Sequence, residues 1–527
     1  MNLTDFICVT LLSGFAFIFF SFKLIAVLQQ CGYRLDEFFT ALFCGKKIEI
    51  KRLSTYSLVF AVVLALICPF NDWILNGYFL PSVVTVIFSG AYYFTTKQIK
   101  KAVFTSRLAR VWGVATVAFG LGLAGLTYLA SIFITRVRFL IFLIGLTPIL
   151  SPVFIALGCL VNLPYDFLKY KISLSICKSR LKRNPKLKVI GVTGSMGKTS
   201  VKNYLFKMLA TTYKTLATPM SYNTPLGVCK TVNGGVEGYD FFIVEMGARR
   251  KNDIKKLCKL VNPSIGVITG IAEQHTQTLK GLQGVINAKN QLIEGLLPNG
   301  FAVFSTQTQG SLTMCERAKV KKYGAGLNDG DFVYAKNIIQ KKDGLHFDIV
   351  VGGNPYQTFM PALGVHNVIN ACIATATAVN LGVSVSKILS VIPNLTPPPH
   401  RAEIITTPQG VTVIDDAYNA NLLGISATAQ AVKAFDGRKV AITSGIVELG
   451  ERAYAVNFEV GKILAENFDE IFAVGVNANA VFDGAKTGGV TAKVESSTKS
   501  ASERLKGQLT SGDVVAFFND LPDKYEV

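Results

Sequence analysis

A glycine-rich segment near the middle of the chain has the residue types of a phosphate-binding loop. It runs from Thr193 to Ser200 with the sequence Thr-Gly-Ser-Met-Gly-Lys-Thr-Ser. Glycines let backbone N–H groups approach an anion, Lys198 can reach the outer phosphates of a nucleotide, and the Thr199 hydroxyl can bind Mg²⁺. The residues predicted around a nucleoside triphosphate are Gly194, Ser195, Gly197, Lys198, Thr199 and Ser200. An ordinary turn is the alternative, because the strict pattern has glycine where this chain has Val192.

Two further polar residues follow candidate strands. Glu245 ends one apolar run, and His275 comes shortly after another. Open α/β sheets bind ligands at the carboxyl ends of their strands, so the two side chains are expected near the loop. A carboxylate oxygen suits Mg²⁺, which predicts a metal site formed by Thr199, Glu245 and His275. On spacing alone, a solvated glutamate and a surface histidine explain these residues equally well.

Short apolar runs alternate with helical stretches from Leu187 onward, which indicates a parallel, doubly wound sheet. A helix is expected over Val201–Thr211, directly after the glycine-rich loop. Between about Lys321 and Pro361, segments such as Leu345–Val351 predict antiparallel strands inserted before a helix at His366–Asn380. The parallel strands expected are Lys188–Thr193, Tyr239–Glu245, Ser264–Thr269 and Gly300–Ser305.

Three consecutive prolines, Pro397–Pro399, predict a stiff domain boundary because they cannot continue a helix. A second, smaller α/β domain is expected beyond them. Its elements are predicted at Val411–Ile414, Lys439–Thr443, Glu470–Val474 and Asp513–Phe518 as strands, with a helix at Tyr454–Asn467.

The first third of the chain is rich in apolar residues, and half of all 527 residues are hydrophobic. Apolar runs near the length needed to cross a bilayer predict about five transmembrane helices. They lie at Phe6–Val27, Thr55–Phe70, Phe79–Thr95, Val111–Ile134 and Phe139–Val161. Buried re-entrant hairpins are the alternative for the second and third runs. No basic segment precedes the first run and no cleavage site follows it, so an anchor is expected instead of a signal peptide.

The net charge of +20 is concentrated beside these apolar runs. Basic residues in Gln29–Leu53 and Thr96–Arg110 place those loops in the cytoplasm, and everything after Pro164 with them. The sequence therefore predicts an integral protein of the cytoplasmic membrane whose catalytic domains lie in the cytoplasm. The charge is expected to face membrane lipids, with no nucleic acid as partner. The ten cysteines are scattered singly and predict reduced thiols.

The fold class predicted is an α-helical membrane domain followed by two α/β domains: a central P-loop ATPase-type parallel sheet and a smaller Rossmann-like C-terminal domain. The expected boundaries are 1–165 for the membrane domain, 166–187 for a basic juxtamembrane linker, 188–399 for the central domain and 400–527 for the C-terminal domain.

An ordered set of motifs over residues 187–527 resembles the Mur ligase family. The motifs are Thr193–Ser200, Ser221–Val228, Glu245–Ala248, His275, Ala288–Lys289, Gly364–Val368, Arg401 and Asp415–Asn421. Within the family, Asp415–Asn421 and Val447–Gly450 are most similar to the branch that adds D-alanyl-D-alanine. The resemblance implies an ATP- and Mg²⁺-dependent ligase of cell-wall precursor synthesis. Such an enzyme joins a D-alanyl-D-alanine-like amine to a muramoyl-peptide-like carboxylate through an acyl phosphate.

The resemblance also implies a role for each matching residue. Lys198 holds the β- and γ-phosphates, Thr199 binds one Mg²⁺, and Glu245 with His275 binds a second. Lys289, which lies 14 residues after His275, is carbamylated and completes the metal environment. Asn367 contacts adenine, Arg401 a phosphate at the hinge, and Asp415 the ribose. The substrate cleft is shaped by Asn223, Thr224, Tyr418, Asn419 and Asn421. Without the resemblance, Lys289 is a solvated helix lysine, Asp415 a polar strand end, and Tyr418 and Asn419 turn residues.

Some features depart from the family pattern. A membrane segment stands where the domain for a UDP-linked substrate is usual, so the acceptor is UDP-linked or lipid-linked. Ser305–Gln307, Asn457 and Asn519–Asp523 also differ from common family residues, which leaves the incoming amine open. A related ligase with other substrates is one alternative. A P-loop membrane ATPase or transporter is the other, but the apolar runs carry hardly any charge.

Overall fold

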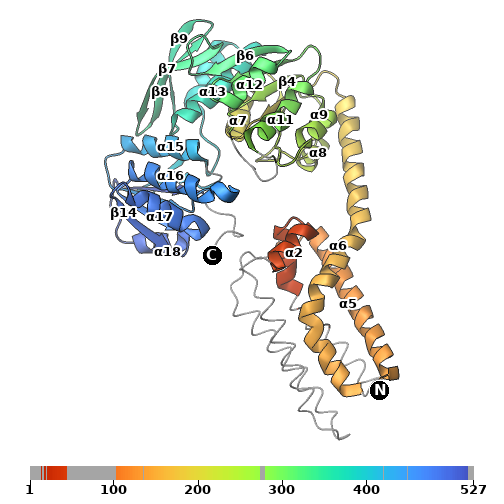
Figure 1. Ribbon diagram of the computed structural model, residues 1–527. Helices are drawn as coiled ribbons and strands as arrows, with labels where there is room; N and C mark the ends of the chain where they lie inside the picture. The colour runs from red at the N-terminus through yellow and green to blue at the C-terminus, as the bar shows by residue number, and fades with distance from the viewer. Residues whose placement is uncertain are drawn as a thin grey trace. The chain divides into compact units, whose positions relative to one another are not determined.

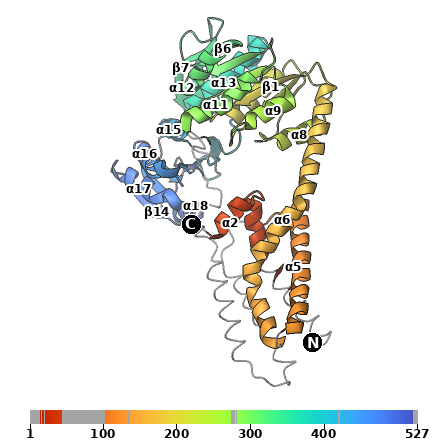
Figure 2. The same ribbon diagram turned by 45° about the vertical axis from the view of Figure 1, so that its right-hand side comes forward.

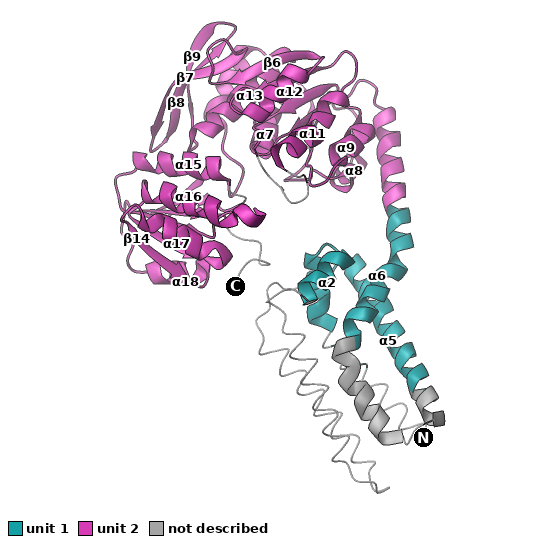
Figure 3. Ribbon diagram, in the orientation of Figure 1, with its two compact units in different colours: residues 1–169 teal, residues 170–527 magenta. Residues whose placement is uncertain are grey.

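The structure is a computed structural model (Figure 1). It describes residues 14, 17–18, 21–43, 102–133, 136–272, 279, 281–418, 421–447 and 449–519. The chain divides into two compact units, Met1–Lys169 and Tyr170–Val527, which are coloured separately in Figure 3.

The first unit is helical. Its described elements are α2 (Leu35–Phe43), α5 (Ser106–Phe133) and the first part of α6 (Arg136–Lys182). Phe17 stacks on Phe119 with ring centroids 4.4 Å apart, and the indole of Trp112 donates a hydrogen bond to Ser21 Oγ at 2.8 Å. Residues 21–30 are also helical, and they share with α5 a core that includes aromatic side chains.

The prediction of about five membrane spans is not supported. Within the described residues, two helical segments are long and apolar enough to cross a bilayer, Ser106–Leu126 and Leu150–Lys182. Two such helices are weak evidence, because a core helix of a soluble protein has the same length and composition. The expected spans at Thr55–Phe70 and Phe79–Thr95 lie outside the described residues. The stretch expected as a basic linker is helical as far as Lys182, where α6 ends.

The second unit begins with a sheet of nine strands (Figure 1). In spatial order these are β2 (Thr215–Ala217), β3 (Phe241–Glu245), β1 (Lys188–Thr193), β4 (Ile265–Ile268), β5 (Phe301–Ser305), β6 (Lys321–Gly326), β7 (Val333–Lys341), β8 (Gly344–Val351) and β9 (Asn354–Met360). The strands from β2 to β7 pair in parallel, and β7, β8 and β9 pair antiparallel. The expected parallel sheet with an antiparallel insertion is therefore confirmed.

Helices cover both faces of this sheet because its strands are apolar on both sides (Figure 2). Ile190, Val192 and Ile243 pack against α7 (Lys198–Leu209), α13 (Val365–Asn380) and α14 (Val385–Val391). Val189 and Phe242 point to the other face. That face is covered by α8 (Pro225–Asn233), α9 (Asp253–Val261), α11 (Gly281–Glu294) and α12 (Gln309–Arg317).

A second sheet of six strands follows residue 402. Its order is β10 (Glu403–Thr406), β11 (Thr412–Asp416), β15 (Val514–Phe518), β12 (Lys439–Thr443), β13 (Glu470–Val474) and β14 (Thr491–Glu495), and only the β10–β11 pair is antiparallel. One face packs against α15 (Leu422–Ala431), α16 (Ala453–Ala465) and α17 (Ala478–Lys486), and the other against α18 (Thr498–Leu505). This sheet and its helices form the second lobe, and the nine-stranded sheet with its helices forms the central lobe.

Three strands lie outside the predicted strand regions, β2, β10 and β14, and β6 was expected to be antiparallel but pairs in parallel. The strand β2 has three residues, and β14 alternates charged and apolar residues at a sheet edge. The sequence Lys-Lys-Tyr-Gly-Ala-Gly of β6 contains two glycines, which are poor strand formers. Their pairing depends on neighbouring strands that are distant in the sequence.

Asn457, on α16, is fully buried and fixes the loop after β12. Its Oδ1 accepts a hydrogen bond from the Ile446 N–H at 2.6 Å. Its Nδ2 donates to the carbonyls of Ile446, at 2.9 Å, and Ala453, at 2.8 Å. A histidine could not make all three bonds with one side chain in this position, since an imidazole has two nitrogens.

Replacing Asn457 with alanine should loosen this loop. The variant leaves the buried Ile446 N–H without a partner, which costs about 1–3 kcal/mol. Hydrogen–deuterium exchange of residues 445–447 should therefore become roughly tenfold faster or more. Asn380→Ala is the control, because that amide donates one bond to Ala376 within α13 and should leave the loop's exchange unchanged. Equal exchange in Asn457→Ala and the parent protein would contradict the role of Asn457.

Candidate active site

The glycine-rich loop joins β1 to α7, as expected, and α7 begins at Lys198 itself. The backbone of Gly197 has φ +77°, and a Cβ there would lie 2.4 Å from Asn370 Oδ1. A Cβ on Gly194 would lie 1.8 Å from Thr269 Oγ1, on the segment after β4. Both positions therefore require glycine, one for its backbone angle and both for close approach.

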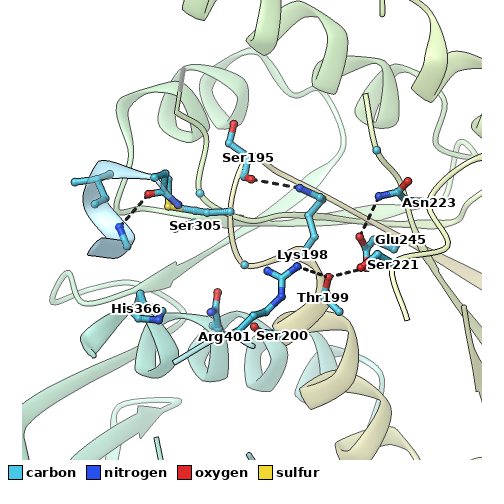
Figure 4. A pocket seen from close by; sticks show the side chains of 18 of the residues that line it. Ser195, Lys198, Thr199, Ser200, Ser221, Asn223, Glu245, Ser305, His366 and Arg401 are labelled. Atoms are coloured by element: carbon cyan, nitrogen blue, oxygen red, sulfur yellow. Dashed lines mark hydrogen bonds between the residues drawn. The ribbon is translucent and has the colours of Figure 1, made fainter. Parts of the chain in front are cut away.

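Two lysines converge on this loop, Lys198 half-buried and Lys289 buried. Lys198 Nζ donates to the carbonyls of Gly194, at 2.8 Å, and Ser195, at 3.3 Å (Figure 4). Lys289 Nζ, from α11, donates to the same Gly194 carbonyl at 2.8 Å, and its residue is 3% exposed. Neither lysine has an ion-pair partner among the described residues. Two ammonium groups on one neutral oxygen repel each other, which favours loss of a proton from one of them.

Burial changes the protonation of both lysines. It lowers the pKa of Lys198 to about 8, although Glu245 opposes the shift. It holds the pKa of Lys289 well below its usual range, and the charge of Lys198 adds to this effect. Lys289 is therefore more readily neutral, and hence more nucleophilic, than a solvated lysine.

Glu245 lies at the end of β3, next to β1, and is 1% exposed. Its Oε2 accepts from Thr199 Oγ1 at 3.0 Å, and its Oε1 accepts from Asn223 Nδ2 at 3.3 Å (Figure 4). Lys202, one turn after Lys198 on α7, lies 3.3 Å from the same Oε2. The predicted proximity of Glu245 and Thr199 is therefore present in the structure.

The metal site itself is described only in part. His275 lies outside the described residues. Among the residues that are described, no group of three or more His, Cys, Asp and Glu side chains could hold a metal ion. The oxygen pair of Thr199 and Glu245 is the part of the predicted set that the structure brings together.

Asn367 occupies the start of α13, where it is buried. Its Oδ1 accepts from the Tyr204 hydroxyl at 3.0 Å, and its Nδ2 donates to the Leu363 carbonyl at 2.9 Å. The neighbouring His366 lines the same cavity, and burial lowers its pKa to about 4. These contacts fix both side chains beside the glycine-rich loop.

The second lobe contributes residues across from the loop. Arg401 donates to Thr199 Oγ1 at 3.2 Å, and its guanidinium carbon lies 4.5 Å from the centre of the Tyr418 ring. The Tyr418 hydroxyl donates to Ser221 Oγ at 2.8 Å. The residues on either side of Arg401, His400 and Ala402, have φ values of +62° and +53°. The arginine is thus presented by an unusual backbone turn.

Asp416, and not Asp415, lines the cavity. Asp415 is engaged by His400 Nδ1, which lies 2.7 Å from its Oδ2, and by the backbone N–H of Ala417. Asp416 accepts from Thr428 Oγ1 at 3.1 Å, and burial raises its pKa to about 6. In a strand, successive side chains point to opposite faces, so one residue along β11 reverses the assignment.

These residues line one cavity of about 810 Å³. The predicted site residues among its lining are Ser195, Gly197, Lys198, Thr199, Ser200, Asn223, Thr224, Glu245, Lys289, Asn367, Arg401, Tyr418 and Asn421. Thr224 and Asn421 also cap helices, since their side-chain oxygens accept from the N–H groups of Gly227 and Gly424. Asn419 lies outside the described residues.

The sequence prediction missed three residues of this region: Lys202, His366 and Asp416. Lys202 follows Lys198 by four residues, the spacing at which two helix side chains share a face, and this signal was present in the sequence. The choice between Asp415 and Asp416 had no such signal, because the alternation of β11 depends on its partners.

Comparisons with known proteins agree with this arrangement. The Mur ligase middle domain matches residues 192–378, and the Mur ligase glutamate ligase domain matches residues 400–518. The UDP-N-acetylmuramoyl-tripeptide–D-alanyl-D-alanine ligase of Bacillus subtilis is 30% identical over 335 residues, 63% of this chain and 72% of the relative. The ligase of the same name from Haemophilus influenzae is 30% identical, covering 59% of this chain and 68% of the relative.

This chain belongs to the Mur ligase family. Members of the family are ATP-dependent ligases. A crystal structure of MurF from Acinetobacter baumannii aligns with a TM-score of 0.61 and 28% identity, over 66% of this chain and 77% of the other. MurF ligase from Thermotoga maritima in complex with ADP, 21% identical with a TM-score of 0.59, shares the fold.

The comparisons correct the predicted localisation of this Mur ligase. The two family domains begin at residue 192, so the family match does not include the apolar first third of the chain. The described residues contain only the two apolar helical segments noted above. The prediction of an integral membrane protein was therefore wrong, and membrane lipids are not supported as partners. The prediction rested on the length and apolar composition of these runs, which do not by themselves separate a membrane span from another helix.

Substituting Gly197 should weaken nucleotide binding by this Mur ligase. In Gly197→Ala the new Cβ meets Asn370, and the left-handed backbone costs about 1–2 kcal/mol for an L-residue. The dissociation constant for ADP, measured by calorimetry, should rise roughly tenfold or more. Gly330→Ala is the control. Gly330 also has a positive φ, +95°, but a Cβ added there meets no atom within 4 Å, so ADP affinity should not change. Equal losses in both variants would refute the steric argument.

The raised pKa of Asp416 predicts a pH-dependent contribution to stability. An ordinary aspartate titrates near 3.8, whereas folded Asp416 titrates at about 6. Between these values the folded protein holds a proton that the unfolded chain lacks, so Asp416 favours folding more as the pH falls. The unfolding temperature of the parent minus that of Asp416→Asn should therefore rise as the pH is lowered from 7 to 4.5. A difference that is constant over this interval would contradict the pKa shift.

Proposed function

We propose that this Mur ligase uses ATP to join D-alanyl-D-alanine to the terminal carboxylate of a UDP-N-acetylmuramoyl-tripeptide. The names of the similar ligases supply both substrates. The single observation that carries the proposal is the cavity in which Lys198, Lys289, Thr199, Glu245 and Arg401 meet. We assign the nucleotide chemistry to residues 188–399 and a closing function to residues 400–527.

The reaction begins with activation of the carboxylate, which is a poor acylating agent by itself. A carboxylate oxygen attacks the γ-phosphorus of ATP, the bond to the β,γ-bridging oxygen breaks, and ADP leaves. The product is an acyl phosphate. Lys198 and the N–H groups at the start of α7 stabilise the charge on the transferring phosphoryl oxygens. Arg401, whose guanidinium already contacts Thr199, adds positive charge from the second lobe.

Mg²⁺ fits the oxygens that this chain offers. Two neighbouring ligands in an octahedral shell, each at about 2.1 Å from the ion, lie about 3 Å apart. Thr199 Oγ1 and Glu245 Oε2 are separated by 3.0 Å, and both are hard oxygen donors. We therefore assign these two residues to the ion, with His275 as a further ligand. When bound, Mg²⁺ supplies Lewis acidity that neutralises phosphate charge.

Lys289 is proposed to carry a carbamate. Its pKa is held well below the usual range, so the neutral amine is available to attack CO₂ with loss of one proton. The product would place a negative charge beside Lys198, which otherwise has no ion-pair partner among the described residues. The burial of Lys289, at 3% exposure, would protect the carbamate from hydrolysis.

The nucleoside is assigned to the start of α13 and to the second lobe. Asn367 is proposed to contact adenine with the hydrogen-bonding capacity that Tyr204 and Leu363 leave unused. The ribose contact first expected of Asp415 is reassigned to Asp416, because Asp416 lines the cavity. Arg401 is proposed to bind a phosphate.

Formation of the amide follows in the same cavity. The amine nitrogen attacks the acyl carbon, a tetrahedral intermediate forms, and phosphate leaves as the carbonyl is restored. Water would hydrolyse the acyl phosphate, so exclusion of solvent is part of the chemistry. The hydrogen bond between Tyr418 and Ser221 joins the two lobes at the cavity and is proposed to help exclude water. Asn223, Thr224 and Asn421 are proposed to shape the substrate end.

Lys198→Ala tests this function directly. The parent protein should release ADP in a coupled assay only when UDP-N-acetylmuramoyl-tripeptide and D-alanyl-D-alanine are both present. Mass spectrometry should show the pentapeptide product. The variant should lose about 10²–10³-fold in turnover, because one preorganised charge at the transferring phosphoryl group is lost.

Lys207→Ala is the matched control. Lys207 lies on the same helix but contacts only the carbonyl of Asn394 among the described residues, so its removal should leave turnover within twofold or so of the parent. ADP release that needs neither substrate would refute the ligase proposal. If ADP release required the tripeptide together with a different amine, the ligase activity would stand and D-alanyl-D-alanine would not be the amine substrate.

A further inference from the structure

Lys202 is a buried lysine that the nucleotide chemistry leaves unexplained. It is 1% exposed, lies on α7 and does not line the cavity. A buried charge is costly unless it is paired and hydrogen-bonded. Lys202 satisfies both conditions, since its Nζ lies 3.3 Å from Glu245 Oε2 and also donates to the carbonyl of Met220.

These two contacts connect three parts of the site. The lysine comes from the helix that follows the phosphate loop, and the carboxylate ends β3. Met220 precedes the segment that carries Ser221, Asn223 and Thr224, and it adopts a left-handed backbone with φ +45°. The same segment returns to the carboxylate, because Asn223 Nδ2 donates to Glu245 Oε1 at 3.3 Å. Lys202 and Asn223 therefore hold the two carboxylate oxygens from different sides.

We infer that Lys202 is a positioning residue that fixes the orientation of Glu245 and limits how tightly Glu245 holds a divalent cation. The inference rests on the proposed assignment of that cation to Thr199 and Glu245. Lys202 shares Oε2 with Thr199, so a cation bound at this oxygen lies close to the ammonium charge. Like charges at such a distance repel, which opposes cation binding.

Two consequences of opposite sign follow from this arrangement. Without the ammonium charge, Glu245 is left unbalanced and should bind a divalent cation more tightly. Without the tether, Glu245 and the Met220 segment lose their fixed orientation, and turnover should fall. General damage to the fold would weaken both cation binding and turnover. Tighter binding together with slower turnover is therefore specific to the proposed role.

The experiment measures Mn²⁺ binding to the ADP-bound full chain by electron paramagnetic resonance, without turnover. Lys202→Met should bind Mn²⁺ at least about tenfold more tightly than the parent. Lys202→Gln, a second neutral variant that keeps an N–H donor for Met220, should shift the affinity in the same direction. Lys202→Arg retains the charge and should stay within about threefold of the parent. Lys207→Met, an exposed lysine on the same helix, is the matched control and should change nothing.

Steady-state kinetics then separate positioning from substrate binding. Lys202→Met should lower kcat roughly tenfold or more with little change in the KM for ATP, and Lys202→Arg should restore much of kcat. In the Glu245→Gln background, replacing Lys202 with methionine should no longer tighten Mn²⁺ binding, because the lysine acts through the carboxylate. This neutral pair also keeps a testable fold if Lys202→Met alone is unstable.

The outcomes distinguish the two proposals. If Glu245→Gln binds Mn²⁺ as well as the parent, the assigned cation site is wrong and the proposed metal ligands fail. If Glu245→Gln loses Mn²⁺ but neutral Lys202 variants bind it equally or more weakly, the cation site stands and the role of Lys202 is refuted. If Lys202→Met still tightened Mn²⁺ binding in the Glu245→Gln background, the proposed role of Lys202 would also be refuted.

Discussion

The meeting of two lysine side chains at one carbonyl oxygen is the constraint on which the active site depends. Lys198 and Lys289 both donate to Gly194, and neither has a carboxylate partner among the described residues. Such an arrangement is stable only because the two lysines are held from different elements, α7 and α11, by a packed sheet. The parallel order β3-β1-β4 brings the loop, Glu245 and the segment after β4 to the same edge. Loss of a proton from Lys289 relieves the repulsion and leaves Lys198 as the charge available to a phosphate.

The central lobe and the second lobe contribute different things to the chemistry. The central lobe supplies most of the polar groups near the phosphate loop, of which Thr199, Glu245 and Lys289 are buried. The second lobe supplies Arg401, Asp416 and Tyr418, of which Tyr418 is exposed. This division suits a reaction with an unstable intermediate, because the central lobe carries the charged groups and the second lobe adds further groups at the same cavity. The acyl phosphate needs strong electrostatic stabilisation and also protection from water.

The sequence allowed much of this site to be predicted, and its errors have physical causes. The glycine-rich loop, the parallel strands and Glu245 followed from local patterns, because a strand, a turn and a helix are encoded within a few residues. The antiparallel strands at β7–β9 were also expected in part. The edge strands β2 and β14 were missed, since they are short and gain stability from partners far along the chain. The face of β11 could not be read locally for the same reason, so the sequence named Asp415 where the structure places Asp416 in the cavity lining. The localisation was misjudged because it rested on length and apolar composition, which do not by themselves distinguish a membrane span from another helix.

The backbone around Arg401 has a consequence for variation of the sequence. His400 and Ala402 both adopt positive φ without being glycine, a conformation that disfavours β-branched and bulky side chains. Each such residue costs of order 1–3 kcal/mol, and such strain persists only where the surroundings enforce it. Few residue types should therefore be tolerated at positions 400 and 402, even though neither side chain needs to contact the nucleotide. The backbone turn sets the direction in which the guanidinium points. Retaining the arginine alone, without neighbours that can adopt positive φ, would therefore not preserve this direction.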